Sequence, residues 1–239
     1  MNLILLNENN PLQPFPPLQK ALKDPNGLLA VGGCLSAERL LNAYQNGIFP
    51  WFSDDDPILW WSPNPRLVLF PENLYISKKL AKTLRQNKFE FAMNTAFDLV
   101  IEKCAQLRAD AEGTWITRDI KSAYANLHRQ GFAHSFEAWQ NGELVGGLYG
   151  IALGKIFFGE SMFHEVSDAS KVAFVHCMRY LKQHDFKLID CQVYSEHLAS
   201  LGAEEISRAE FSNWLLHAKS REKLPVTDFK QIDIDVLTQ

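Results

Sequence analysis

The order of elements expected after residue 88 constrains the fold of this chain more than any other feature. Alternating apolar and polar residues predict strands, apolar residues at helical spacing predict helices, and Asn141-Gly142 predicts a tight hairpin. The expected elements are a strand (89–93), two helices (95–107, 117–129), three strands (133–140, 143–151, 156–162), a helix (169–184), a strand (186–193) and a helix after Ser207. The chain is therefore predicted to be of the α+β class, with a mixed sheet at its centre.

The same order resembles the acyl-coenzyme A-dependent N-acyltransferase (GNAT) fold. In that fold the third strand of the meander and the strand after the next helix splay apart, and the acyl donor meets the amine in the gap. Those two strands here carry Glu160 and the pair Asp190 and Gln192. Prolines at 57, 63, 65 and 71 favour a domain boundary near residues 62–66. We therefore expect a small N-terminal domain (1–64) followed by a GNAT-like domain (65–239).

Asp190 and Gln192 are the polar residues of an otherwise apolar stretch that is long enough for one buried strand. They are two positions apart, so their side chains are expected to project from the same face of the strand. A buried carboxylate and carboxamide are costly unless they are paired. A structural polar pair and an active-site pair that orients a nucleophile both satisfy this requirement, and spacing alone does not separate them.

Three tryptophans lie within residues 51–61, a stretch rich in loops. Trp60 and Trp61 are expected in the core, where most tryptophans of small domains lie. Trp51 stands between Pro50 and Phe52 in an expected loop, which favours a stacking surface. A nucleic-acid base stacked on an aromatic ring is worth roughly 1–3 kcal/mol.

The helix expected after Ser77 carries a run of basic residues. Lys78, Lys82 and Arg85 are spaced four and three apart and so share one face, and two further lysines flank them. The run is compatible with a solvated helix face and with a contact to a phosphate backbone. No acidic residue interrupts it, although the chain as a whole has a net charge of −4, so the phosphate contact stays open.

Composition and termini favour a cytoplasmic protein. The N-terminus lacks the basic region of a signal peptide, and no apolar run approaches the length of a membrane span. The cysteines show no zinc-site spacing and are expected to be free thiols in a reducing compartment. They are Cys34, Cys104, Cys177 and Cys191.

The loop before the central helix argues against coenzyme A as the acyl donor. Coenzyme A users of this fold have a glycine-rich loop there, whose backbone N–H groups cradle the pyrophosphate. Residues 163–168 contain no glycine and two acidic residues, so this loop is expected to repel a pyrophosphate. The basic helix and the loop tryptophans suggest an acyl donor carried on RNA instead.

Six motifs in the same order resemble the bacterial leucyl/phenylalanyl-tRNA–protein transferase family, and the likeness spans roughly residues 12 to 225. His197 and Ser200-Leu201-Gly202 add to the match. The motifs are Asn26-Gly27-Leu28-Leu29-Ala30, Gly47-Ile48-Phe49-Pro50-Trp51-Phe52, Leu59-Trp60-Trp61-Ser62-Pro63, Glu112-Gly113-Thr114-Trp115-Ile116-Thr117, Gly159-Glu160-Ser161-Met162-Phe163 and Leu188-Ile189-Asp190-Cys191-Gln192.

The resemblance implies an enzyme that takes leucine or phenylalanine, less well methionine, from charged tRNA. It implies an acceptor protein beginning with Arg or Lys, whose new N-terminus marks it for degradation by the N-end rule route. No metal, organic cofactor or membrane is implied.

The resemblance also implies site residues. It assigns Asp190 and Gln192 to catalysis, and it places Glu160 at the mouth of the aminoacyl pocket, holding the amino group of the transferred residue. Cys177 and Leu148 depart from commoner family choices, which puts the preference between leucine and phenylalanine in doubt. The implied pocket wall is Leu148, Phe157, Met162, Phe174, Cys177 and Ile189, and the implied tRNA contacts are Trp51, Trp115, Lys78, Lys79, Lys82 and Arg85.

Three alternatives stay open from sequence alone. A transferase of similar fold that builds peptidoglycan bridges uses the same acyl donor with another acceptor. A non-catalytic adaptor binds charged tRNA without transferring its amino acid. A coenzyme A acetyltransferase is disfavoured by the glycine-free loop.

Overall fold

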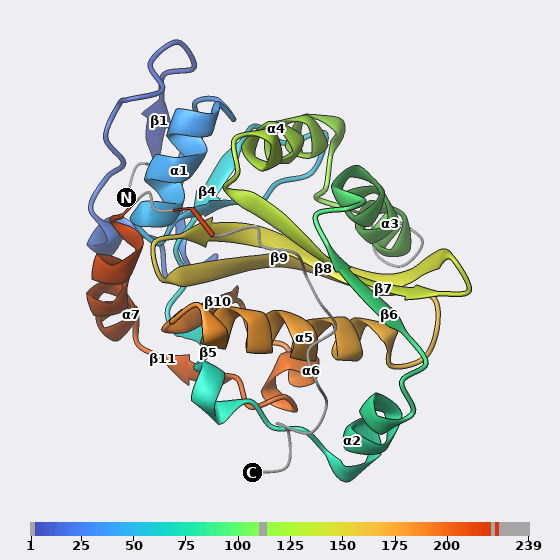
Figure 1. Ribbon diagram of the computed structural model, residues 1–239. Helices are drawn as coiled ribbons and strands as arrows, with labels where there is room; N and C mark the ends of the chain where they lie inside the picture. Colours follow the sequence, from blue (N-terminus) through green and yellow to red (C-terminus); the bar gives the residue numbers. More distant parts are fainter. Residues whose placement is uncertain (1–2, 110–113, 221–222, 225–239) are drawn as a thin grey trace.

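The computed structural model describes residues 3–109, 114–220 and 223–224, which form two sheets and their covering helices (Figure 1). The N-terminal sheet has the strand order β1-β2-β4-β3. Its strands have two to five residues, too few to display a clear period, so the sequence did not reveal them. They are β1 (Ile4–Leu6), β2 (Leu28–Gly32), β3 (Phe49–Pro50) and β4 (Leu59–Trp61), with η1 (Leu18–Lys20) and α1 (Ala37–Gln45) between them.

The second sheet has seven strands in the order β11-β5-β10-β9-β8-β7-β6. Neighbouring strands are antiparallel except for the parallel pair β9 and β10. The predicted α+β class and GNAT-like mixed sheet are confirmed, whereas β5 and β11 at one side of the sheet were not expected. The strands are β5 (Arg66–Leu69), β6 (Glu90–Met93), β7 (Ala133–Gln140), β8 (Glu143–Leu153), β9 (Ile156–His164), β10 (Leu188–Gln192) and β11 (Glu204–Ile206).

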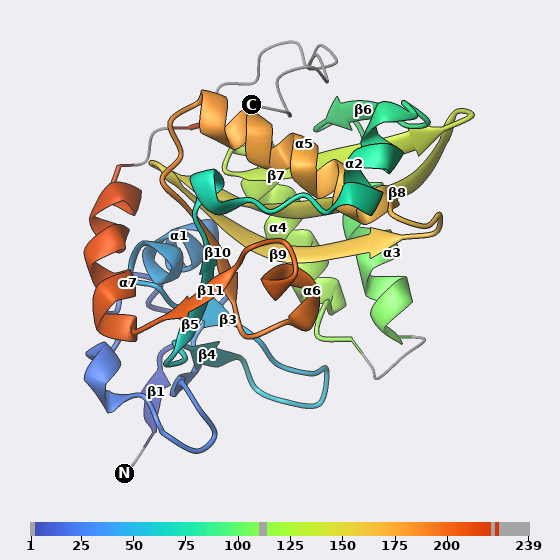
Figure 2. The same cartoon turned by 90° about the horizontal axis from the view of Figure 1, so that it is seen from below.

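Helices cover both faces of the seven-stranded sheet (Figures 1 and 2). The first face carries α3 (Phe97–Ala109) and α4 (Arg118–Arg129), and the opposite face carries α5 (Ala169–Gln183). α2 (Lys78–Arg85) packs on α5. The remaining helical segments are η2 (Pro71–Asn73), α6 (Glu196–Ala199), α7 (Arg208–Trp214) and η3 (Leu215–Ala218). Among the described residues, none of the helices combines the length and apolar character that a bilayer crossing requires.

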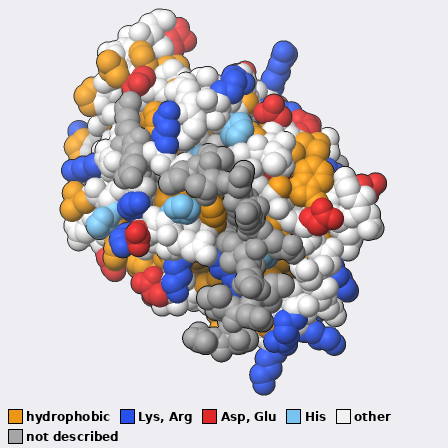
Figure 3. All heavy atoms as spheres, in the orientation of Figure 1, with side chains coloured by type: hydrophobic (Ala, Val, Ile, Leu, Met, Phe, Trp, Pro, Cys, Tyr) orange, Lys and Arg blue, Asp and Glu red, His pale blue; other side chains and the backbone are white. Residues whose placement is uncertain are grey.

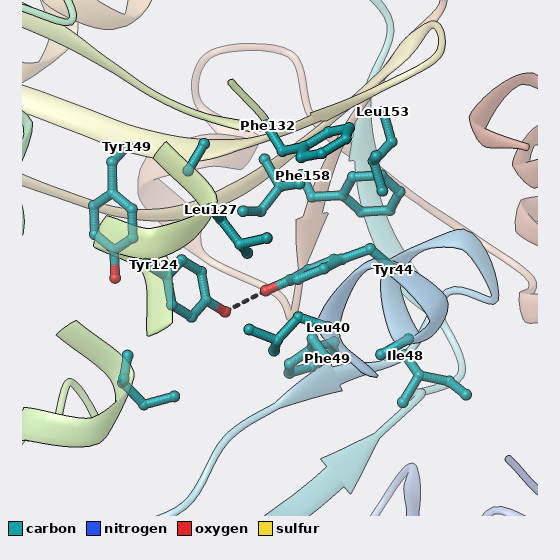
Figure 4. Close-up of a cluster of buried hydrophobic side chains, with 14 of the residues drawn as sticks. Leu40, Tyr44, Ile48, Phe49, Tyr124, Leu127, Phe132, Tyr149, Leu153 and Phe158 are labelled. Carbon is teal, nitrogen blue, oxygen red and sulfur yellow. Dashed lines mark hydrogen bonds between the residues drawn. The ribbon is translucent and has the colours of Figure 1, made fainter. Parts of the chain in front are cut away.

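The core is divided into two clusters by the sheet, and β8 contributes to both. Tyr149 and Ile151 face the first cluster, while Leu148 and Ala152 face the second. A strand covered on both faces reads as a continuous apolar run, as residues 144–153 do. The first cluster also includes side chains of the N-terminal residues, and Figure 4 shows Leu40, Tyr44, Ile48 and Phe49 beside Tyr124, Leu127 and Phe158. The chain passes from the N-terminal sheet to the seven-stranded sheet between Trp61 and Arg66. The domain boundary at residue 64 stays a prediction.

The N-terminal end of α3 differs from expectation. An asparagine directly before a helical pattern predicts an N-cap, but the side-chain oxygen of Asn94 instead accepts the backbone N–H of Ser135. The carboxylate of Glu137, a buried residue of β7, accepts the backbone N–H groups of residues 95 and 96 at 3.0 and 2.9 Å. A partner from a neighbouring strand thus replaces the local cap, which sequence spacing cannot reveal.

Candidate active site

A cleft opens where β9 and β10 diverge. The two strands pair only from Leu188 and Ile156 to Asp190 and Phe158. Beyond that point a cavity of about 240 Å³ lies between them. The divergence expected from the fold is therefore present, and Glu160 and Gln192 both line the cavity.

Most of the expected site residues line this cleft. Cys177 is buried in the second core cluster, which also contains Leu148 and Phe157, but its side chain does not line the cavity. Asp190 lies behind the cleft wall. The expected residues that line the cavity are Trp51, Trp115, Leu148, Phe157, Glu160, Met162, Phe174, Ile189 and Gln192.

Glu160 is a buried carboxylate held by three hydrogen-bond donors. Its Oε1 accepts the Tyr44 hydroxyl at 2.7 Å and the Gln192 Nε2 at 2.9 Å. Its Oε2 accepts the Tyr124 hydroxyl at 3.0 Å. Burial raises the pKa of Glu160 to about 8, against the lowering effect of these hydrogen bonds and with a smaller raising effect from the Asp190 charge.

Asp190 forms a fully buried ion pair with Arg66 of β5. The Arg66 guanidinium donates from Nε to Oδ1 at 2.7 Å and from Nη2 to Oδ2 at 2.6 Å. The rings of Phe49 and Phe211 lie 4.8 and 4.7 Å from the guanidinium carbon. A bidentate ion pair of this kind has a fixed geometry. Removing one of its two partners would leave an unpaired buried charge and destabilise the fold.

Gln192 follows Asp190 with an irregular backbone. Its φ angle is 65°, in the left-handed region, and the pairing with β5 shifts register between Asp190 and Gln192. The backbone N–H of Gln192 donates to Asp190 Oδ1 at 2.9 Å. The two side chains were expected to share one face, but this bulge gives them separate partners: Arg66 for Asp190 and Glu160 for Gln192.

Two tryptophans come to the cleft from different parts of the chain. Trp51 is 44% exposed, and its carbonyl accepts the Nε1–H of Trp61 at 2.7 Å. Trp115 is half-buried; residues 112 and 113 of its motif lie outside the described residues. Trp60 is fully buried, as expected.

The basic run lies on α2, which begins after Ser77 because the Ser77 hydroxyl accepts the backbone N–H of Leu80. The four basic side chains are exposed and form no ion pair with other described residues. Figure 3 shows Lys and Arg side chains gathered over α2, at the lower edge of the molecule. They are Lys78, Lys79, Lys82 and Arg85.

Sequence reasoning missed the residues that hold the polar groups of the cleft. Tyr44, Tyr124 and Arg66 were not among the predicted site residues. Their partners lie 116, 36 and 124 positions away along the chain, so no local pattern connects them. The remaining signal is that a buried tyrosine hydroxyl usually needs a hydrogen-bond partner. Among the described residues, no three His, Cys, Asp or Glu side chains cluster as metal ligands.

A mixed sheet that opens over a carboxylate and a carboxamide defines the class as an N-acyltransferase-like enzyme. The family model "Leucyl/phenylalanyl-tRNA protein transferase" matches residues 68–216, and the model of its N-terminal domain matches residues 33–64. This chain belongs to the leucyl/phenylalanyl-tRNA protein transferase family.

Close relatives carry the same family name. A leucyl/phenylalanyl-tRNA–protein transferase of Methylococcus capsulatus is 60% identical over 87% of this chain and 89% of its own length. One of Pseudomonas putida is 58% identical over 85% of this chain and 90% of its own length. A solved aminoglycoside acetyltransferase from an uncultured soil sample is more distant, with 13% identity, coverage of 61% of this chain and 97% of that chain, and a TM-score of 0.38.

Proposed function

We propose that this chain transfers leucine or phenylalanine, and less well methionine, from charged tRNA to the α-amine of proteins beginning with Arg or Lys. The product carries a bulky apolar N-terminus that marks it for degradation by the N-end rule route. One observation carries this proposal: in a chain 60% identical to such a transferase, Glu160 and Gln192 meet in an apolar cleft.

The cleft has the chemistry that the acyl donor needs. Leu148, Phe157 and Phe174 give an uncharged wall for a leucine or phenylalanine side chain. Glu160, at the mouth of the wall, holds the amino group of the transferred residue. Trp51 and Trp115 stack on the terminal adenosine of the tRNA.

The basic helix α2 contacts phosphates of the acceptor stem, so recognition depends on the RNA backbone and the amino acid more than on the bases. The exposure of its lysines and arginine supports this role.

Transfer converts an ester into an amide, so it is favourable without a cofactor. The attacking α-amine has a typical pKa of about 7.7–8.0 and is partly neutral near pH 7. Holding amine and ester in attack geometry can supply about 7–11 kcal/mol. Gln192 donates its Nε2 to Glu160, which leaves its carbonyl oxygen to orient the attacking amine.

Asp190 acts on this arrangement through the backbone. Its charge is matched by Arg66, and its Oδ1 holds the left-handed Gln192 in place. These contacts favour Asp190 as a positioning residue, although sequence resemblance assigned it to catalysis together with Gln192.

The decisive experiment incubates the purified protein with tRNA charged with labelled leucine and a peptide that begins with arginine. Label in the peptide is the expected result. Matched controls are the same peptide with its amine acetylated and a peptide that begins with aspartate, both of which are expected to remain unlabelled. Label found only in a cell-wall precursor, or acetyl transfer from acetyl-coenzyme A, would contradict the proposal.

A further inference from the structure

We propose that the Glu160 carboxylate, closed into a ring with the hydroxyls of Tyr44 and Tyr124, accepts the proton that the attacking amine loses. This proposal rests on the proposed function and deepens it, because it assigns the proton to a group other than Asp190 or Gln192. The two tyrosines then serve as positioning residues for the acceptor carboxylate.

Three oxygen–oxygen contacts close the ring. Tyr44 Oη lies 2.7 Å from Oε1 of Glu160, and Tyr124 Oη lies 3.0 Å from Oε2. The third contact joins the two hydroxyl oxygens and is the dashed line of Figure 4. When Glu160 is ionised and both hydroxyls donate to it, no hydrogen remains for the contact between the two hydroxyl oxygens, so only two of the three contacts are hydrogen bonds at one time. A proton on Glu160 fills that contact, and every contact in the ring becomes a hydrogen bond.

The neighbouring polar groups are less suited to accept this proton. Gln192 is a neutral amide and a poor base. Asp190 is fully buried, does not line the cleft, and has both oxygens engaged by the Arg66 guanidinium. Glu160 lines the cleft, and its Oε2 accepts one hydrogen bond where a carboxylate oxygen has room for two.

The position of Glu160 also fits the reacting atoms. In an aminoacyl ester the amino group and the carbonyl carbon are separated by a single carbon atom. A carboxylate that holds this amino group therefore lies next to the amine that attacks the carbonyl. One side chain can serve both groups without a change of conformation.

The reaction balances without any further reactant. The neutral α-amine attacks the ester carbon, a C–N bond forms, and the nitrogen loses one proton to Glu160. The bond between the carbonyl carbon and the ribose oxygen then breaks, and Glu160 returns the proton to that oxygen. Glu160 begins and ends the cycle ionised, and the products are an amide and a free ribose hydroxyl.

The surroundings favour a carboxylate that changes its protonation in this range. No lysine or arginine among the described residues pairs with it, and burial raises the pKa of Glu160 to about 8, near that of an α-amine. Titratable groups around it are Tyr44 on α1, Tyr124 on α4, Tyr149 on β8 and Asp190 on β10 with its partner Arg66. Arg108 of α3, Cys191 of β10 and His197 of α6 line the same cleft, and Cys104 and Arg108 act on Tyr149.

The first test measures the protonation of Glu160 in the absence of any substrate. Infrared difference spectra of wild type minus Glu160→Gln, recorded across pH 5 to 10, report the carbonyl stretch of a protonated carboxyl group. We expect this band at pH 6 and its loss around pH 8. A hydrogen bond donated to an ionised carboxylate is stronger than the neutral bonds of the protonated ring. Tyr44→Phe and Tyr124→Phe each remove one such donor, so each is expected to move the midpoint to higher pH.

The second test measures single-turnover leucine transfer over the same pH range with saturating substrates. Each Tyr→Phe variant is expected to shift the rate–pH midpoint in the same direction as its infrared midpoint. Titration of the peptide amine is common to all variants, so the shift between them belongs to the ring. Glu160→Gln is expected to lose roughly 10²–10⁴-fold in rate.

Tyr75→Phe is the matched control for both tests. Its side chain is 61% exposed and does not line the cleft. We expect this variant to leave both midpoints in place.

Two outcomes would overturn the proposal: no protonated-carboxyl band that depends on Glu160, or transfer by Glu160→Gln at the wild-type rate and pH profile. If the wild-type protein transfers no leucine from charged tRNA, the proposed function is wrong, and so is the role that we assign to the ring. The infrared result separates the two failures, since it requires no transfer.

Discussion

At the scale of single residues, burial sets the protonation of a histidine that lies outside the cleft. His176 on α5 is 2% exposed, and its ring stacks on Phe91 with 3.6 Å between centroids. Neither ring nitrogen has a hydrogen-bond partner among the described residues. Burial first, and then the charge of Arg179, lower the pKa of His176 to about 3.

This lowered pKa predicts a loss of stability in acid. Between pH 6.5 and about 3 the unfolded chain binds a proton that the folded imidazole does not, so the free energy of unfolding falls as pH falls. The slope approaches 1.4 kcal/mol per pH unit. Urea unfolding at pH 7 and pH 5 is expected to show about 2 kcal/mol less acid loss for His176→Phe than for wild type. The same replacement at exposed His164 is the control, and equal acid losses in wild type and His176→Phe would contradict the argument.

A second residue-scale prediction concerns Trp51. If its exposed ring stacks on the terminal adenosine equally before and during reaction, Trp51→Ala raises KM for charged tRNA and leaves kcat nearly unchanged. The loss of roughly 1–3 kcal/mol corresponds to a KM increase of roughly 5- to 150-fold. Trp51→Phe keeps an aromatic face and is expected to retain most of the affinity. Steady-state kinetics with varied tRNA measure this, and an unchanged KM would remove Trp51 from the site.

The sequence predicted burial well but polar partners poorly at this scale. The helical spacing of Ile120, Tyr124 and Leu127 predicts that Tyr124 is buried, and its complete burial confirms this. Tyr44 is completely buried as well. Their shared hydrogen bonds to Glu160 join three elements and depend on tertiary packing. Helical periodicity reports which face is inside, and it carries no information about which distant group a hydroxyl meets there.

At the scale of elements, local chemistry fixed several helix starts. Ser36, Ser77 and Ser207 each accept a backbone N–H of the first turn, as a serine directly before a helical pattern predicts. Thr117 caps its helix in the same way, although the sequence predicted it as the first helical residue. The elements that the sequence did not predict are short strands, which form only when they pair with a neighbouring strand. β11 has three residues, and β5 has four, so neither displays a period that exceeds chance. Missing β5 matters for the site, because this strand supplies Arg66, which pairs with Asp190.

The basic helix α2 gives an element-scale prediction. Each phosphate contact contributes about 0.7–0.9 to the slope of log binding constant against log salt concentration. Replacing both Lys78 and Lys82 by Gln is therefore expected to reduce this slope by about 1.4–1.8. The pair Lys20→Gln and Lys23→Gln, also exposed but far from α2 in sequence, is the matched control. Charged-tRNA titrations at several salt concentrations provide the measurement, and an unchanged slope would exclude the helix from the binding surface.

At the scale of the whole molecule, the two sheets share one core. Leu40 and Trp60 of the N-terminal residues belong to the same buried cluster as Ile151 and Phe158 of the larger sheet. The prolines that mark the predicted boundary therefore separate two sheets without interrupting the packing between them.

This shared cluster predicts cooperative unfolding. Urea transitions followed by amide exchange in β2 and in β8 are expected to have the same midpoint, because opening either sheet exposes the cluster. Leu40→Ala is expected to destabilise both by about 2–5 kcal/mol. Two separate transitions, or a loss confined to the N-terminal residues, would show that the sheets are independent.

The two tryptophans of the cleft come from different parts of the fold: Trp51 lies between β3 and β4 of the small sheet, and Trp115 precedes α4 beside the large sheet. If the terminal adenosine of the tRNA stacks on both rings, as proposed, it connects the two sheets across the cleft. Binding of the tRNA end in the cleft and the stability of the packing between the two sheets are then thermodynamically linked. A tRNA end supplied at 100 times its Kd would raise the free energy of unfolding by about 2.7 kcal/mol. Binding of the substrate would then stabilise the site that binds it.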